Sequence, residues 1–237
     1  MDGGAVDVGP ARQRFLLAAL LIEPNRPISA DQLVERMWAD RAPHRARGTL
    51  RTYLSRLRNA LAVTDEVRIG RRAGGYVLTL EPSMVDLHLF RHLVATARSS
   101  DDNTAVDLFD RALALWHGEP FAGLDTPWIS AVRAELDAER VEVELDRGDL
   151  LLRRGRHSEL LAALCTMTSA RPLDERLVGQ LILALYRSGR QADALDRYEH
   201  VRARLAEDLG AHPSPPLRQL HHQILTADPA LLSPARS

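Results

Sequence analysis

The sequence contains no lysine, so all 31 of its basic side chains other than histidine are arginines. A single cysteine, Cys165, excludes an internal disulfide framework and any site built on paired cysteines. No run of about 18 apolar residues occurs, which excludes an obvious membrane-spanning helix. The first ten residues also lack the basic and apolar regions of a secretory signal. We therefore expect a cytoplasmic protein with no membrane partner.

The net charge of −1 conceals an uneven distribution of charge along the chain. Residues 1–80 hold 13 arginines against 8 acidic residues, whereas residues 81–237 hold 18 arginines against 24 acidic residues. Most of the positive charge falls within residues 41–80, where nine arginines accompany only Asp65 and Glu66. Such a concentration of positive charge predicts a polyanionic partner for the first part of the chain.

Three helices and a hairpin are predicted within the first 80 residues. Residues 12–22 and 29–38 have helical periodicity, and Ser29 suits the N-cap of the second helix. Pro43 is expected to open a third helix, because proline costs little at the first helical position. Residues 67–80 alternate apolar and polar side chains around two glycines, which predicts two short strands joined by a tight turn. This order of elements is typical of a winged helix.

The third helix combines an apolar stripe with a basic outer surface. The apolar side chains recur at helical spacing and are expected to face the core: Leu50, Tyr53, Leu54, Leu57 and Leu61. The opposite side gathers two arginines and two threonines: Arg45, Thr49, Thr52 and Arg56. Further arginines lie along one flank: Arg47, Arg51 and Arg58.

This surface has the chemistry of a DNA-binding helix. An α-helix fits the major groove, where arginine can bond a guanine edge and threonine can contact a base or the thymine methyl group. Arginines on the flank suit phosphates, and Arg71 and Arg72 at the tip of the hairpin suit the adjacent minor groove. The alternative is a solvated helix face with no partner. The absence of interleaved acidic residues for ion pairs within the helix favours DNA.

From Asp86 onward the pattern is helical and contains an internal repeat. Residues 150–164 align with residues 184–198 at an offset of 34, the period of tetratricopeptide repeats. Ala105 with Phe109, and Ala194 with Tyr198, repeat a small-to-aromatic spacing that lets two helices approach closely. These features predict a stack of helical hairpins.

Other candidate chemistry is sparse. Cys165 lies in an apolar helix and is expected to be a buried thiol rather than a nucleophile. Adjacent His221 and His222 point in different directions on a helix, so no metal site is predicted. Trp116 and Trp128 flank a loop rich in glycine and proline and are expected to belong to the core. No cofactor is expected, and the chain is not expected to be an enzyme, because no catalytic pair or triad is recognised.

The motifs taken together resemble a known family. "TLRTYLSRLRNAL" followed by "GGYVL" resembles the OmpR-type winged helix of the SARP family, the antibiotic regulatory proteins of streptomycetes and related actinobacteria. This winged helix is also the effector domain of many two-component regulators. "ALALWHGEPF", "RPLDE" and "LYRSGRQADALDRYEHVRARLAEDLGAHPSPPLRQLHHQIL" are similar to the bacterial transcriptional activation domain of the same family. The resemblance covers residues 9–228.

The resemblance implies a mainly α protein with two domains. Residues 1–80 would form the winged helix-turn-helix, and residues 86–230 would form an all-α, tetratricopeptide-like domain. Family members place a small sheet before the first helix, for which only residues 5–10 could supply a strand here. We therefore expect that sheet to be reduced or truncated.

The resemblance also implies a function and partners. These are transcriptional activation of antibiotic or other secondary-metabolite genes, binding to direct repeats of double-stranded promoter DNA, a second protomer on that DNA, and recruitment of RNA polymerase including its sigma factor. The family's base-reading positions correspond to Thr49, Thr52 and Arg56. The positions expected near phosphates correspond to Arg45, Arg47, Arg51 and Arg58, and those of the wing to Arg71 and Arg72. A helical-repeat protein whose basic face binds RNA or an acidic protein is the alternative.

Overall fold

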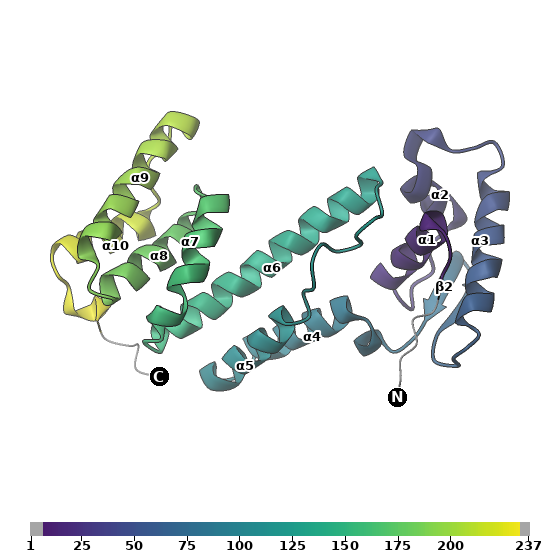
Figure 1. The fold of residues 1–237 in the computed structure, drawn as a ribbon, viewed down its shortest axis with the longest axis horizontal. Coiled ribbons are helices and arrows are strands. Elements are labelled where there is room, and N and C mark those ends of the chain that lie inside the picture. Colours follow the sequence, from purple (N-terminus) through teal and green to yellow (C-terminus); the bar gives the residue numbers. More distant parts are fainter. Residues whose placement is uncertain (1–6, 233–237) are drawn as a thin grey trace. The chain divides into compact units, whose positions relative to one another are not determined.

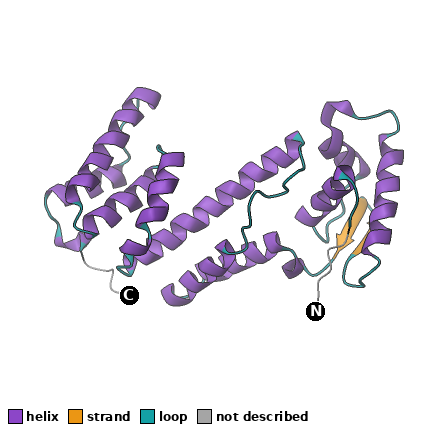
Figure 2. Cartoon of the chain, in the orientation of Figure 1, coloured by secondary structure: helices purple, strands orange, loops and turns teal. Residues whose placement is uncertain are grey.

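The structure, a computed structural model, describes residues 7–232 and is mainly helical (Figures 1 and 2). Within these residues, ten α-helices accompany one two-stranded antiparallel sheet. The helices are α1 Ala11–Ile22, α2 Ala30–Trp38, α3 Ala46–Leu61, α4 Asp86–Arg98, α5 Asp102–Leu113, α6 Pro127–Arg153, α7 Leu161–Ala170, α8 Glu175–Arg187, α9 Gln191–Leu209 and α10 Pro215–Leu225; the strands are β1 Arg68–Arg72 and β2 Gly75–Thr79. The predicted fold class, a winged helix followed by an all-α domain, is confirmed.

The chain divides into two compact units. The first contains α1 to α4, both strands and Asp110–Arg140, and the second contains Ser100–Phe109 and the residues from Val141 onward. Helices α5 and α6 therefore each contribute to both units. The predicted domain division at residues 80–86 stays a prediction. Of the predicted N-terminal strand, Ala5 and Val6 lie outside the described residues, and residues 7–10 form no strand.

The first helices of the winged helix begin and pack as their sequences predict. Helix α1 packs against α2, α3 and β2. At the start of α2, the Ser29 hydroxyl accepts a 3.1 Å hydrogen bond from the Gln32 backbone N–H, and the Gln32 side chain accepts one of 3.0 Å from the Ser29 N–H. This reciprocal arrangement satisfies two N–H groups that the helix leaves without partners. Trp38 at the end of α2 is buried.

The start of α3 differs from the prediction. Pro43 does not open the helix; it precedes a turn at His44 and Arg45, and the Ala46 N–H bonds to the Pro43 carbonyl at 2.9 Å. The helix begins at Ala46, with Arg45 as its N-cap residue. Proline restricts its own φ angle and does not fix the conformation of the residues that follow. The helix therefore begins only after the turn at His44 and Arg45.

A third extended segment holds the hairpin in place. Ile28 and Tyr76 exchange two backbone hydrogen bonds of 2.8 and 2.9 Å, so residues 25–28 run along β2. Asn25 adopts a positive φ of 62°, and its side chain bonds the backbone N–H and carbonyl of Leu80. At Gly75, with φ of 153°, a Cβ atom would lie 2.0 Å from the Ile28 carbonyl oxygen. Glycine is therefore required for this close approach.

The apolar core of the winged helix continues beyond its hairpin. Leu124 and Ile129 are buried in the same cluster as the residues of α1, α2 and α3. The Trp128 ring, half-buried rather than fully buried, meets the Phe15 ring edge-on, with 5.7 Å between centroids. The Arg36 guanidinium lies over the Trp128 ring, 4.8 Å from its centre. The loop before α6 and the first turn of α6 therefore complete the core of the first unit.

In the second unit, the repeat seen in the sequence corresponds to two helices that end in the same way. Gly155 and Gly189, 34 residues apart, follow α6 and α8 with φ angles of 72° and 76°. The next N–H in each copy bonds five residues back, Arg156 to Leu151 at 2.9 Å and Arg190 to Leu185 at 3.0 Å. Both helices thus end in the same glycine motif. Ala194, Tyr198, Ala105 and Phe109 are buried, which confirms their predicted place in the core.

The environment of Cys165 was predicted wrongly. The thiol is exposed on α7, whose buried side chains are Leu164 and Thr168. Apolar side chains occur on the exposed side of α7 as well as on its buried side. The composition of the helix therefore did not show which side packs against the core. Among residues 7–232, no helix has the length and apolar character needed to cross a membrane.

Candidate nucleic-acid interface

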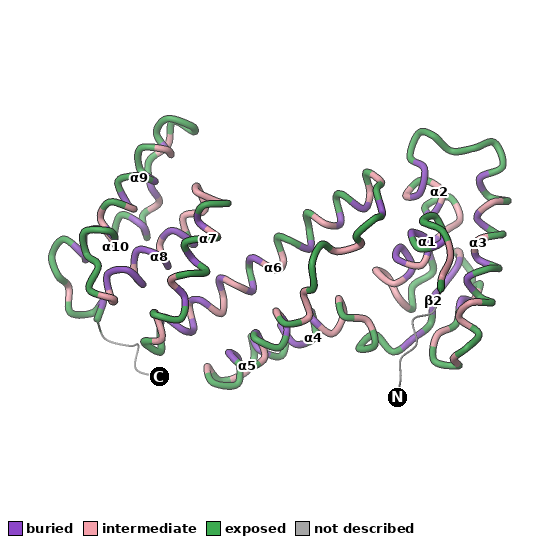
Figure 3. Tube along the Cα trace, in the orientation of Figure 1, coloured by how far each residue is buried: buried purple, intermediate pink, exposed green. Residues whose placement is uncertain are grey.

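Helix α3 separates a buried apolar face from an exposed polar one, as Figure 3 shows by the alternation of buried and exposed residues along it. Leu50, Leu54 and Leu57 are fully buried, and Tyr53 and Leu61 are partly buried against the same core. Full burial of each leucine contributes about 1.5–3 kcal/mol, so the rotation of the helix about its axis is fixed. This confirms the predicted stripe.

The opposite face presents the predicted base-reading positions. Thr52 and Arg56 are exposed, and Thr49 is half-buried. The two threonine hydroxyls each donate a 3.3 Å hydrogen bond to the carbonyl four residues earlier, Thr49 to Arg45 and Thr52 to Gly48. The oxygen of each hydroxyl can still accept a hydrogen bond from another group. The bond to the carbonyl also fixes the orientation of the threonine side chain, including its methyl group. The three side chains therefore share one exposed side of the helix.

Two arginines on the flank have partners inside the protein. Arg47 donates two hydrogen bonds of 2.8 Å to the carboxylate of Asp31 in the first turn of α2. Arg58 donates from Nε to the carbonyl oxygen of Ile69 in β1 at 2.9 Å. The sequence showed no acidic partner within α3, but Asp31 is supplied by another helix. Both arginines remain exposed at the surface.

The remaining arginines of the predicted surface are available for an external anion. Within residues 7–232, none of these five forms an ion pair with a protein carboxylate: Arg45, Arg51, Arg56, Arg71 and Arg72. The acidic residues of the winged helix that do form ion pairs take other partners, since Glu23 pairs with Arg36 at 2.6 Å and Asp65 with Arg68 at 2.9 Å. Five of the arginines without a carboxylate partner in the described part of the chain therefore lie on α3, at its N-cap and on the hairpin; the others of the winged helix are Arg12, Arg14, Arg26, Arg41 and Arg58, the last of which bonds the Ile69 carbonyl.

The hairpin, or wing, places its two arginines at the turn. Arg71 pairs with Tyr76 and Arg72 with Gly75 in the register of the sheet, and Ala73 and Gly74 form the turn. Successive residues of a strand point to opposite faces, so these two arginines leave the wing on opposite sides. Figure 2 shows the strands beside α3, which contacts β1.

Sequence reasoning missed two residues of this surface. Asp31 was not among the predicted site residues, because its partner Arg47 lies 16 residues away in the sequence. Gly48 lies on the exposed side of α3, and a Cβ atom there would meet nothing within 4 Å. Glycine inside a helix is unfavourable relative to alanine by roughly 0.5–1 kcal/mol, so an unexplained glycine in an exposed helix was the available signal.

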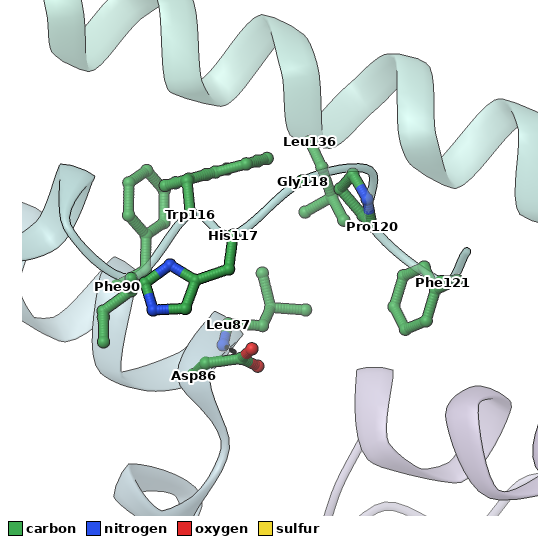
Figure 4. A pocket seen from close by; sticks show the side chains of 10 residues that line it. Asp86, Leu87, Phe90, Trp116, His117, Gly118, Pro120, Phe121 and Leu136 are labelled. Carbon is green, nitrogen blue, oxygen red and sulfur yellow. Dashed lines mark hydrogen bonds between the residues drawn. The ribbon is translucent and has the colours of Figure 1, made fainter.

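A separate cavity of about 240 Å³ lies in the first unit between α4, α6 and the loop that joins α5 to α6. Figure 4 shows Phe90 and Trp116 together on one side, with Phe121 across from them. The loop is held by Arg133, which donates hydrogen bonds of 2.7–2.9 Å to the carbonyls of three loop residues: Pro120, Phe121 and Leu124. Its aromatic lining suits an apolar group, not a sugar-phosphate chain. In the described part of the chain, no three histidine, cysteine or acidic side chains are placed to hold a metal.

Comparisons with known proteins agree with this geometry. The family model of the bacterial transcriptional activator domain matches residues 85–225, and that of the C-terminal domain of transcriptional regulatory proteins matches residues 8–78. Regulatory protein AfsR of Streptomyces coelicolor is 41% identical over 235 residues, covering 97% of this chain and 23% of AfsR. Regulatory protein DnrI of Streptomyces peucetius is 33% identical over 233 residues, covering 93% of this chain and 85% of DnrI.

A solved structure shares the fold. The structure of Mycobacterium tuberculosis EmbR in complex with a low-affinity phosphopeptide superimposes with a TM-score of 0.88 at 33% identity, over 96% of this chain and 62% of EmbR. The fold and its exposed basic helix define a transcriptional regulator of the winged-helix class. The chain belongs to the SARP family of transcriptional regulators. It spans less than a quarter of the length of the AfsR proteins that it matches.

Proposed function

We propose that this chain is a transcriptional activator that binds direct repeats in promoter DNA through α3 and the wing. The observation that carries the proposal is the exposed face of α3, where Thr52 and Arg56 stand beside Arg45 and Arg51. These three arginines have no carboxylate partner in the described residues, unlike Arg47, which pairs with Asp31. A helix of this kind fits the major groove. The wing, anchored to α3 through Arg58 and Ile69, would place Arg71 or Arg72 against the backbone or the minor groove.

Binding of labelled promoter fragments tests the DNA-binding part. Arg56→Ala is expected to cost roughly 1–3 kcal/mol of discrimination between the preferred and altered sites, because a bidentate arginine contact to a base is lost. Arg218→Ala, which removes the same charge from an exposed position on α10, is the matched control and should leave the preference unchanged. Equal binding by the wild type and Arg56→Ala at every sequence would contradict the proposal.

Activation requires the second part of the proposal, recruitment of RNA polymerase through its sigma factor and other subunits. Membership of the SARP family supports this part, and it also supports antibiotic or other secondary-metabolite promoters as the targets. Run-off transcription with purified polymerase holoenzyme provides the test. Added protein should increase transcripts only from templates that carry the direct repeats. Strong binding without any increase in transcription would leave a DNA-binding protein that does not activate.

Direct repeats imply that two protomers bind head to tail. We expect a protein that is mainly monomeric in solution and forms two-to-one complexes with DNA, which analytical ultracentrifugation resolves. A tight dimer without DNA would contradict this arrangement. If unrelated RNA or heparin displaces the protein from every duplex equally, the alternative of a basic surface for RNA or an acidic protein is favoured instead.

A further inference from the structure

The ion pair between Arg47 and Asp31 lies within the surface proposed to bind DNA. The guanidinium donates two hydrogen bonds of 2.8 Å to the carboxylate, the shortest distance between a nitrogen and an oxygen of the pair is 2.6 Å, and the two side chains are 67% and 70% exposed. Of the nine positions predicted to contact DNA, Arg47 is the one whose ion-pair partner lies within the described residues. The pair joins the first turn of α2 to the first turn of α3.

Asp31 holds the guanidinium at the edge of an open groove. The groove has a volume of about 410 Å³ and runs between the start of α2 and the turn that precedes α3. Asp31 and Val34 line it from α2, and Arg45, Arg47 and Gly48 line it from the other side. A negative charge is therefore fixed at the place where two arginines would otherwise attract a phosphate.

The energetics favour exchange of partners at this position. An exposed ion pair contributes little to stability, because water and salt screen it and two side chains lose freedom. A duplex phosphate can therefore take the guanidinium from Asp31. After the exchange, the Asp31 carboxylate lies unpaired beside the DNA and attracts a cation from solution. Uptake of this cation offsets part of the favourable free energy that comes from counterions released by the duplex.

We propose that Asp31 is a positioning residue that competes with DNA phosphate for Arg47 and so lowers the affinity of the protein for DNA of any sequence. The proposal rests on the proposed function of α3 as a DNA-binding helix. Sequence-independent binding depends on phosphate contacts, so this competition limits the time spent on unrelated DNA. The contacts of Thr52 and Arg56 to bases do not involve this ion pair.

The test measures binding to an unrelated duplex between about 50 and 200 mM salt, the range in which phosphate contacts dominate the dependence. Asp31→Asn is expected to bind roughly three- to tenfold more tightly at low salt and to steepen the slope of log K against log salt by about 0.9, the value of one additional phosphate contact. In the Arg47→Gln background the same substitution should give a much smaller gain, because only the direct repulsion between Asp31 and the duplex remains to be removed. Circular dichroism melting establishes that each variant is folded at the assay temperature.

Asp65→Asn is the matched control, because it removes the same charge from an exposed arginine pair of the same winged helix. Its effect should be much smaller than that of Asp31→Asn. Equal gains from both substitutions, or a gain from Asp31→Asn that is undiminished with Arg47→Gln, would show a general charge effect and overturn the inference. If Asp31→Asn changed neither the affinity for the unrelated duplex nor the salt dependence, the inference would also be overturned. A wild-type protein that binds no duplex even at low salt would instead refute the proposed function.

Discussion

The side chain of Arg58 in the last turn of α3 donates a 2.9 Å hydrogen bond to the carbonyl oxygen of Ile69 in β1. Ile69 is itself buried in the core of the winged helix. The bond therefore fixes the proposed DNA-reading helix relative to the wing by a contact between side chain and backbone. In the proposed complex, the two elements would meet the duplex as one rigid surface.

Substitution of Arg58 should separate its two roles. Arg58→Ala is expected to lower the free energy of unfolding by about 1 kcal/mol, because the bond to the Ile69 carbonyl is lost, and also to weaken duplex binding. Arg58→Gln keeps a donor of similar reach but removes the charge. If the anchor matters most, the glutamine variant should retain more affinity than the alanine variant. Equal losses of affinity in both variants would assign the effect to charge. Denaturant unfolding and duplex titration measure the two quantities.

Gly48 offers a test in which stability and binding change in opposite directions. Gly48→Ala should raise the free energy of unfolding by roughly 0.5–1 kcal/mol, because alanine is the better helix former and its methyl group meets no protein atom within 4 Å. The same methyl group should weaken duplex binding where the DNA backbone approaches the helix. Gly179→Ala in α8, where a Cβ would make an ordinary 3.7 Å contact, is the matched control. It should leave binding unchanged, and unchanged binding by Gly48→Ala would refute the close approach.

Trp128 tests whether the winged helix depends on residues beyond its hairpin. Trp128→Ala should lower the free energy of unfolding of the first unit by about 2–4 kcal/mol, because the contact to Phe15 and the surrounding apolar burial are lost. Trp128→Phe keeps an aromatic ring and should lose less. Thermal or denaturant unfolding checks both variants. If neither variant unfolds earlier than the wild type, the contact of Trp128 with Phe15 adds little to the stability of the first unit.

His221 on α10 should make the second unit sensitive to pH. Its ring stacks on the ring of Tyr198 in α9, with 3.8 Å between the ring centroids. Burial lowers the pKa of His221 below the ordinary 6.5. Because the folded protein binds this proton less readily than the unfolded chain, the stabilising contribution is present above pH 6.5 and is lost as pH falls through the lower folded pKa. Unfolding measured at pH 7.5 and at lower pH should show the loss in the wild type. His221→Phe, which keeps the stacking, should lose less stability over the same pH range. An identical pH dependence in both proteins would assign the loss of stability to other groups.

The sequence by itself determined the features that depend on neighbours along the chain. The leucine stripe of α3, the Ser29 cap and the two strands with their turn follow from periodicity and local hydrogen bonding. The 34-residue repeat was likewise visible, because Gly155 and Gly189 must allow the same positive φ at equivalent helix ends. For the site, the set of exposed threonine and arginine side chains on α3 followed directly from the buried position of the leucines.

Only the tertiary structure decided which of these side chains have partners. Asp31 meets Arg47, and Ile69 meets Arg58, across turns whose geometry depends on the packing of α1 against α2, α3 and β2. The same reason explains why Trp128 joins the core of the winged helix and why Cys165 is exposed. Hydrophobic periodicity shows that a helix has a face to bury, but contacts between distant segments select the partner. The charge that remains available for DNA was therefore set by the fold and not by the arginine count.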